Sequence, residues 1–347
     1  MARSPTDKQL FEELLVRFGQ EIAEAFRKAI EDLTSAADLQ RFITAVQAGD
    51  IEAAIRALHL DPAALGPLQD AIQQAYAAAG QTAAAGMPTL KDPAGAKLVI
   101  RFNARNVRAE AWLRDHSSEL VTRILEDQRT AVRTALVSGM VRGAGPRTVA
   151  LEIVGRVDRS TGKRQGGIIG LTSQQERFAD TARDELASGD PEKLRNYLTR
   201  KLRDRRFDPT VKKAIEAEKP VPAAVAAKAV TKYKSKLLKH RGDTIGRTEA
   251  LTSLRAAKHE TYLQAVESGS LDETAVRRTW RDVGDLRVRH THSRMDGDTV
   301  GLREPFKSPS GARLLFPGDT SLGAPAAEII ACRCDVDYRI DFLANIR

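Results

Sequence analysis

Hydrophobic residues recur every three to four positions along the first part of the chain, and this spacing predicts amphipathic helices. The clearest pattern starts at Ser4-Pro5-Thr6-Asp7, which offers a capping hydroxyl and a proline suited to the first helical turn. Its apolar stripe consists of Phe11, Leu14, Leu15, Phe18, Ile22, Phe26, Ile30 and Leu33. Charged residues occupy the opposite face, so we expect the stripe to be buried in the core or against a partner.

Helical spacing continues through most of the chain before residue 240. Alanine-rich sequence extends to about residue 85, glycine and proline interrupt it near 86–95, and helical spacing returns over 105–141. Between these stretches, the apolar residues of 98–102 predict a short extended segment.

Capping residues and prolines predict four further helix starts and one break. The starts are Pro146, the capping box at Thr172, Asp190-Pro191 and Asp208-Pro209. Pro220 and Pro222 end one segment, and a helix to about residue 238 follows them.

The pattern changes after Gly242. A helix is predicted over 245–267, and short strand-like runs separated by turns follow it. These runs are 277–280, 286–288, 299–300, 314–316 and 336–338. A helix beside a few antiparallel strands is an α+β unit. The predicted fold class is therefore α+β, with mostly α-helical N-terminal and middle regions and a small C-terminal α+β domain.

The sequence predicts three consecutive regions: an N-terminal helical region (1–88), a basic helical middle region (89–241) and the C-terminal domain (242–347). Hydrophobic residues make up 42% and charged residues 29% of the 347 positions, which is typical of globular proteins. No apolar run approaches the roughly 20 residues that cross a bilayer. No apolar signal segment follows the N-terminus, so we expect synthesis in the cytoplasm and no membrane partner.

Positive charge is concentrated in one stretch. The chain has a net charge of +9, yet 195–247 alone contains 16 Lys and Arg against 5 Asp and Glu. Such a stretch attracts polyanions such as double-stranded DNA, although charge runs are also common on solvated helix faces. The candidate DNA contacts are Arg200, Lys201, Arg203, Arg205, Arg206, Lys232, Lys234 and Lys236.

A basic, glycine-rich stretch at 159–170 superficially resembles a phosphate-binding loop. It lacks the Gly-x-x-x-x-Gly-Lys-Ser/Thr order, and no predicted strand precedes it. We expect a flexible loop that contacts a backbone phosphate or a neighbouring subunit.

Two pairs of side chains in the C-terminal region are candidate metal ligands: His290 with His292, and Cys332 with Cys334. On a strand, residues two apart share a face, so each pair would present two ligands together. Two imidazoles and two thiolates suit tetrahedral zinc in a structural site. The alternative is a buried pair of reduced cysteines, because Cys-x-Cys is an unusual spacing for zinc and strains a disulfide.

The ordered motifs of the last 105 residues resemble the phage Mu F-like head morphogenesis domain. They are Arg247-Thr248-Glu249, Trp280, Asp285 with Arg287-Val288-Arg289, His292, Asp296-Gly297, Pro305-Phe306, Pro317-Gly318 and Cys332-Arg333-Cys334. The family's histidine before Asp-Gly matches His292, whereas His290 is not characteristic. The resemblance extends more weakly upstream to about residue 130.

This resemblance implies a minor head protein of a tailed phage, made in the host cytoplasm and present in few copies in the virion. It implies association with the portal and procapsid, and some relatives contact DNA and affect its ejection. We predict no enzymatic activity, because no motif requires it. The alternatives are a nucleic-acid-binding protein acting through 195–247 and, least favoured, a zinc-dependent hydrolase.

A structural network is also predicted around Arg247-Thr248-Glu249. Buried Arg and Glu side chains need charged partners, and Asp285, Arg287 and Arg289 are available. The predicted network consists of Arg247, Glu249, Asp285 and Arg287.

Overall fold

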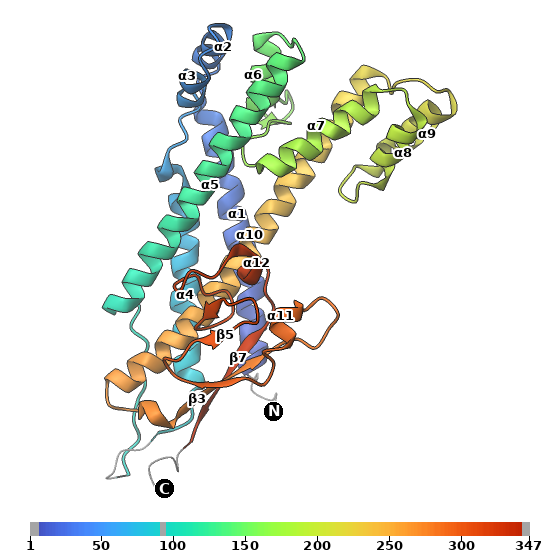
Figure 1. Ribbon diagram of the computed structural model, residues 1–347. Coiled ribbons are helices and arrows are strands. Elements are labelled where there is room, and N and C mark those ends of the chain that lie inside the picture. The colour runs from blue at the N-terminus through green and yellow to red at the C-terminus, as the bar shows by residue number, and fades with distance from the viewer. Residues whose placement is uncertain (1–6, 91–94, 342–347) are drawn as a thin grey trace. The chain divides into compact units, whose positions relative to one another are not determined.

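The structure, a computed structural model, describes residues 7–90 and 95–341 (Figure 1). It is mostly helical and contains small antiparallel sheets, which confirms the predicted α+β class. Among the described residues, no helix combines the length and apolar character needed to span a membrane.

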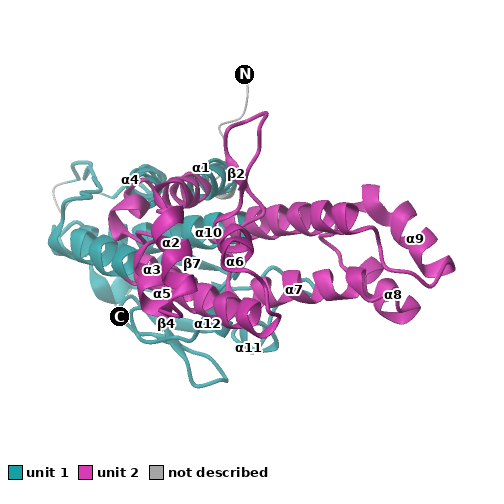
Figure 2. Cartoon of the chain, turned by 90° about the horizontal axis from the view of Figure 1, so that it is seen from above, with its two compact units in different colours: residues 1–24, 68–118, 243–347 teal, residues 25–67, 119–242 magenta. Residues whose placement is uncertain are grey.

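The chain folds into two compact units, each assembled from separated segments (Figure 2). Unit 1 comprises 1–24, 68–118 and 243–347, and unit 2 comprises 25–67 and 119–242. The boundary at 242/243 lies next to the predicted one at 241/242, and the three predicted regions remain a prediction. Four helices contain a unit boundary: α1 (Asp7–Ala36), α4 (Gly66–Gly86), α5 (Val107–Val141) and α10 (Ala223–Glu267).

Unit 2 adds short helices and a small hairpin to parts of these four helices. Its own elements are α2 (Leu39–Gln47), α3 (Ile51–Arg56), η1 (Pro62–Leu65), α6 (Pro146–Val154), β1 (Arg156–Val157), β2 (Arg164–Gln165), α7 (Ser173–Ala187), α8 (Pro191–Thr199), η2 (Arg205–Phe207) and α9 (Asp208–Glu216). The strands β1 and β2 pair antiparallel, so a short strand does precede the glycine-rich loop, contrary to the prediction.

Unit 1 contains the remaining strands. Its own elements are η3 (Glu273–Ala275), β3 (Val276–Arg281), α11 (His290–Ser293), β4 (Thr299–Gly301), β5 (Phe306–Lys307), β6 (Arg313–Leu314), α12 (Ala326–Ile329) and β7 (Asp335–Ile340). The main sheet has the order β4-β3-β7 with both pairings antiparallel, and β5 pairs with β6.

The long first helix is confirmed as α1, although residues 4–6 of its predicted start lie outside the described residues. Phe18, Ile22, Phe26, Ile30 and Leu33 are each at most 2% exposed. The second half of the predicted stripe is therefore core, as the helical spacing requires.

Helix starts predicted from caps are largely confirmed in unit 2. Thr172 forms the capping box of α7, and the Asp190 side chain accepts from the backbone of α8. Asp208 is not the cap of α9, because η2 runs directly into this helix and Phe207 occupies the cap position. The Asp208 carboxylate instead pairs with Arg203 at 2.8 Å.

The predicted break at Gly242 is wrong, since this residue lies inside α10, an unbroken helix of 45 residues. Gly246, one turn later, lies against the backbone of α1, where a Cβ would overlap the Gly19 carbonyl oxygen and lie 2.8 Å from the Ala23 Cβ. This glycine permits a close approach of two helices rather than ending one. Arg247-Thr248-Glu249 consequently lies in the middle of a helix and not at its start.

Three of the five predicted C-terminal strands are confirmed as β3, β4 and β7. The run 286–288 is a turn, because the Asp285 carboxylate accepts from the Arg287 amide and the Asp285 carbonyl from the Val288 amide. The run 314–316 is a strand only to Leu314. No regular strand forms over 98–102, within which Leu98 donates its amide to the Leu90 carbonyl.

Candidate metal centre in the C-terminal region

Three side chains meet in the buried core that the sheet shares with α11 and α12. His292 lies on α11, and Cys332 and Cys334 lie on the irregular segment that leads into β7. Their exposed fractions are 0%, 2% and 2%. The Nδ1 atom of His292 is 3.3 Å from the Cys332 Sγ and 3.5 Å from the Cys334 Sγ. The three ligand atoms all lie within 4.8 Å of one another, which is a geometry that can hold one metal ion.

His290 does not belong to this cluster. Their predicted pairing assumed strand geometry, but His290 and His292 lie on the helical turn α11, where residues two apart point roughly 200° apart. His292 is therefore buried while His290 is exposed. The two cysteines do present their sulfur atoms to the same imidazole nitrogen, although they precede β7 and belong to no regular strand.

A buried carboxylate orients the imidazole. Glu328 of α12 is 5% exposed, and its Oε2 lies 2.7 Å from the Nε2 of His292. An ionised carboxylate only accepts hydrogen bonds, so Nε2 carries the hydrogen and donates it to Glu328. In the neutral ring, Nδ1 then presents its lone pair to the two sulfur atoms.

The neighbouring groups shift the pKa values of this cluster. Burial lowers the pKa of His292, but its hydrogen bonds with Cys332 and Glu328 outweigh burial and raise the pKa above its usual value. The hydrogen bond with Cys334, together with His292 and Arg255, lowers the pKa of the Cys332 thiol. The same shared bond and burial raise the pKa of Cys334. Cys332 is therefore the thiol that ionises first.

Arg255 of α10 fixes the backbone on which both cysteines lie. Its side chain is buried, and its guanidinium donates to the carbonyl oxygens of Pro317 at 3.1 Å and Cys332 at 3.2 Å, and also to that of Cys334. The sequence did not single out Arg255, because its partners lie 62 or more residues further along the chain.

Two side chains of the predicted network, those of Glu249 and Asp285, have other partners. Glu249 is 2.6 Å from the Nε2 of His116, and both side chains are buried. Asp285 accepts two hydrogen bonds of 2.6 Å from Arg333. Arg247 and Arg287 are exposed. Helix α10 is nevertheless linked to the segment that carries the cysteines, because the Ala331 amide donates to the hydroxyl of Thr248.

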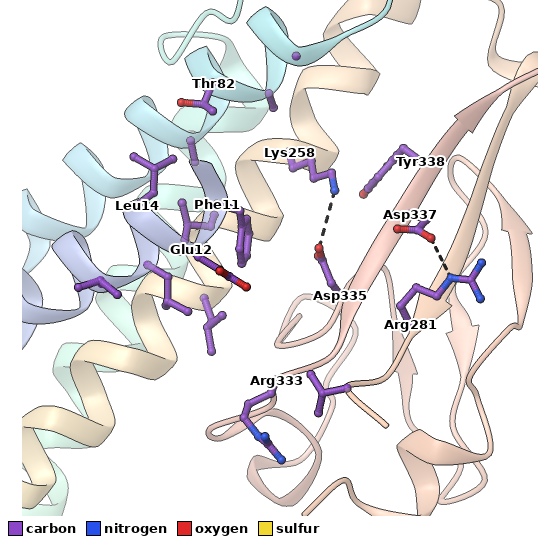
Figure 3. Close-up of a pocket in the computed structure, with 18 of the residues that line it drawn as sticks. Phe11, Glu12, Leu14, Thr82, Lys258, Arg281, Arg333, Asp335, Asp337 and Tyr338 are labelled. Atoms are coloured by element: carbon purple, nitrogen blue, oxygen red, sulfur yellow. Dashed lines mark hydrogen bonds and ion pairs between the residues drawn. The ribbon is translucent and has the colours of Figure 1, made fainter. Parts of the chain in front are cut away.

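A cavity of about 990 Å³ lies elsewhere in unit 1 (Figure 3). Phe11 and Leu14 form part of its apolar lining. Four of its charged groups form two pairs: Lys258 lies 3.9 Å from Asp335, and Arg281 lies 2.8 Å from Asp337.

The eight candidate DNA contacts differ widely in exposure. Lys234 is 4% exposed and donates to the carbonyl oxygens of Glu152 and Gly166, and burial lowers its pKa to about 8. It is therefore inaccessible to DNA, contrary to the prediction. Arg200 and Arg203 are half-buried in ion pairs with Glu185 and Asp208, while Arg206 is exposed and pairs with Asp204. The remaining candidates, Lys201, Arg205, Lys232 and Lys236, are exposed.

These features define an α+β protein in which a long helix packs against a small antiparallel sheet with a histidine–cysteine cluster. Residues 194–337 match the family model described as Phage Mu protein F like protein, so this stretch of the chain is similar to that family. The family is associated with phage head morphogenesis. The matched stretch includes all three residues of the cluster, and the weaker resemblance upstream of 194 remains a prediction. No curated protein and no solved structure matches the chain significantly.

Proposed function

We propose that the chain is a minor head protein, a structural component of the phage virion head that is made in the host cytoplasm and joins the head at the portal during procapsid assembly. The observation that supports this is the family match over 194–337. Buried polar contacts such as those of Arg255 brace the matched stretch, as is expected of a structural component.

Mass spectrometry of purified procapsids and mature virions, from the phage that encodes this chain, tests the proposal. We expect peptides of this chain in both particles, at far fewer copies than the major capsid protein. Absence from both particles, with infectivity still dependent on the gene, would contradict a virion component and indicate a transient assembly factor.

We further propose that the chain is not an enzyme. A zinc-dependent hydrolase needs an open coordination position that substrate can reach. The side chains of His292, Cys332 and Cys334 are at most 2% exposed, which disfavours that alternative.

A second candidate function is contact with double-stranded DNA through the basic stretch of unit 2. The observation that favours it is the exposure of Lys201, Arg205, Lys232 and Lys236. Exposed cations that neutralise backbone phosphates release counterions, so such binding weakens steeply with salt.

Charge reversal of Lys201, Arg205 and Lys232 to glutamate is expected to weaken duplex binding. Each lost phosphate contact lowers the slope of log K against log salt by about 0.9, so the triple variant is expected to lose a slope of about 2–3. Fluorescence anisotropy with a labelled duplex at several salt concentrations measures both quantities.

The matched control reverses three exposed cations outside the stretch: Lys28, Arg41 and Arg114, whose side chains are 61%, 77% and 73% exposed. It carries the same change in net charge and is expected to keep most of the slope. Equal losses in both variants, or none in either, would rule out a specific role for the stretch.

A further inference from the structure

We propose that His292, Cys332 and Cys334 bind one zinc ion through the imidazole Nδ1 and two thiolates, as a structural clip of the C-terminal α+β region. The proposal rests on the geometry of these residues and is independent of the proposed head function.

The separations of the ligand atoms fit a tetrahedral zinc site. With bonds of about 2.3 Å to sulfur and 2.1 Å to nitrogen, tetrahedral ligands are about 3.6 Å apart. The observed separations from Nδ1 to the two Sγ atoms are 3.3 and 3.5 Å. Thiolate and imidazole ligands select zinc over magnesium or calcium, which prefer oxygen ligands.

The surroundings of the cluster also match a metal site. Ligating histidines commonly donate their other ring N–H to a carboxylate, which fixes the ring orientation. Glu328 holds His292 in this way at 2.7 Å. The orientation of the histidine therefore does not depend on the metal alone.

Other residues hold the backbone that carries the two cysteine side chains. Arg255 holds the carbonyl oxygens of Cys332 and Cys334, and the Ala331 amide is bonded to Thr248. All three ligands are thus positioned by contacts of other residues, which lowers the ordering cost of binding a metal.

Zinc binding would convert both thiols to thiolates and release their two protons to solvent, with the imidazole neutral. His292 and Cys332 are 40 residues apart, so the ion would close a long loop and stabilise the folded state. Burial of all three ligands favours this structural role over a catalytic one.

The test uses the full chain, purified under reducing conditions, loaded with zinc and then freed of unbound metal. Elemental analysis is expected to find about one zinc per chain. Cys332→Ser and Cys334→Ser are each expected to abolish tight binding. Glu328→Gln is expected to keep the site while weakening affinity about 10–100-fold.

His290→Ala is the matched control, because His290 lies on the same helical turn but is exposed and outside the cluster. It is expected to retain zinc. Loss of zinc in this variant, or unchanged zinc in both cysteine variants, would overturn the assigned ligand set.

Two measurements on the unaltered chain decide the question if the cysteine variants fail to fold. Cobalt(II) is expected to give thiolate-to-metal charge-transfer absorption, and zinc is expected to protect both thiols from alkylation. A chain that retains no zinc, shows no such absorption and leaves both thiols reactive would overturn the proposal.

Discussion

Replacing Arg278 with methionine is expected to lower the free energy of unfolding by about 3–5 kcal/mol. Arg278 lies in the central strand β3 with a fully buried side chain. Its guanidinium donates to the carbonyl oxygen of Gly301 at 2.9 and 3.0 Å, and also to those of Glu304 and Leu315. Methionine fills a similar volume but removes the side-chain donor to the Glu304 and Leu315 carbonyl oxygens and leaves that of Gly301 with only the Glu304 amide at 3.3 Å. Each unsatisfied buried group costs about 1–3 kcal/mol.

The adjacent residue supplies the control for this prediction. Arg277 has the same chemistry on the same strand but points to the exposed face, so Arg277→Met is expected to change stability by less than about 0.5 kcal/mol. Urea denaturation followed by circular dichroism measures both variants. Equal stability of the two variants would show that the carbonyl oxygens find other donors.

Arg278→Lys separates charge from hydrogen-bond geometry. Lysine keeps the positive charge, but its ammonium is a point donor that lacks the planar fork of arginine. We expect Arg278→Lys to remain destabilised by at least about 1 kcal/mol, because a single ammonium does not serve three carbonyl oxygens on separate segments. The same denaturation experiment checks this.

Local sequence patterns predicted the elements whose stability depends on nearby residues. The apolar stripe predicted α1, and Thr172 with Gln175 predicted the capping box of α7. Short strand-like runs between turns predicted β3 and β7 but did not reveal that Arg278 is buried. That burial depends on the Gly301, Glu304 and Leu315 carbonyls, which lie 23 to 37 residues further along the chain.

The candidate metal centre was predicted only in part for the same reason. The spacing of Cys332 and Cys334 predicted that the two sulfur atoms lie together, and both lie beside the His292 imidazole, although these residues belong to no regular strand. His290 was grouped with His292 on the assumption of a strand, whereas Asp285 forms a turn and a helical turn follows it. Glu328 had no local signal, because it reaches the histidine only through the tertiary fold.

The pairing of His116 with Glu249 shows the limit of such reasoning most directly. The two residues are 133 positions apart and lie on different helices, yet their side chains form a buried contact of 2.6 Å. Each helix could be predicted from its own periodicity. The contact between them depends on how the helices pack, which no local pattern specifies.

Gly246→Ala is expected to destabilise the protein by about 1–3 kcal/mol, although alanine is the better helix former. The glycine lies inside α10, where it lies against the backbone of α1. An added Cβ would overlap the Gly19 carbonyl oxygen and lie 2.9 Å from the Ala23 amide nitrogen. Backbone atoms cannot rotate away as a flexible side chain can, so the two helices would have to separate.

The glycine on the other side of this helix crossing is the matched control. A Cβ on Gly19 would lie 3.9 Å from its nearest neighbours, the Arg247 Cα and the Gly246 carbonyl oxygen, which is ordinary van der Waals contact. Gly19→Ala is therefore expected to be neutral or to stabilise the protein by up to about 1 kcal/mol through its helix propensity. Thermal and urea unfolding of both variants measure the contrast. A loss of stability in Gly246→Ala beside a gain in Gly19→Ala would show that the close approach of the two helices requires glycine at position 246. A gain in stability in both variants would mean that the helices do not approach this closely.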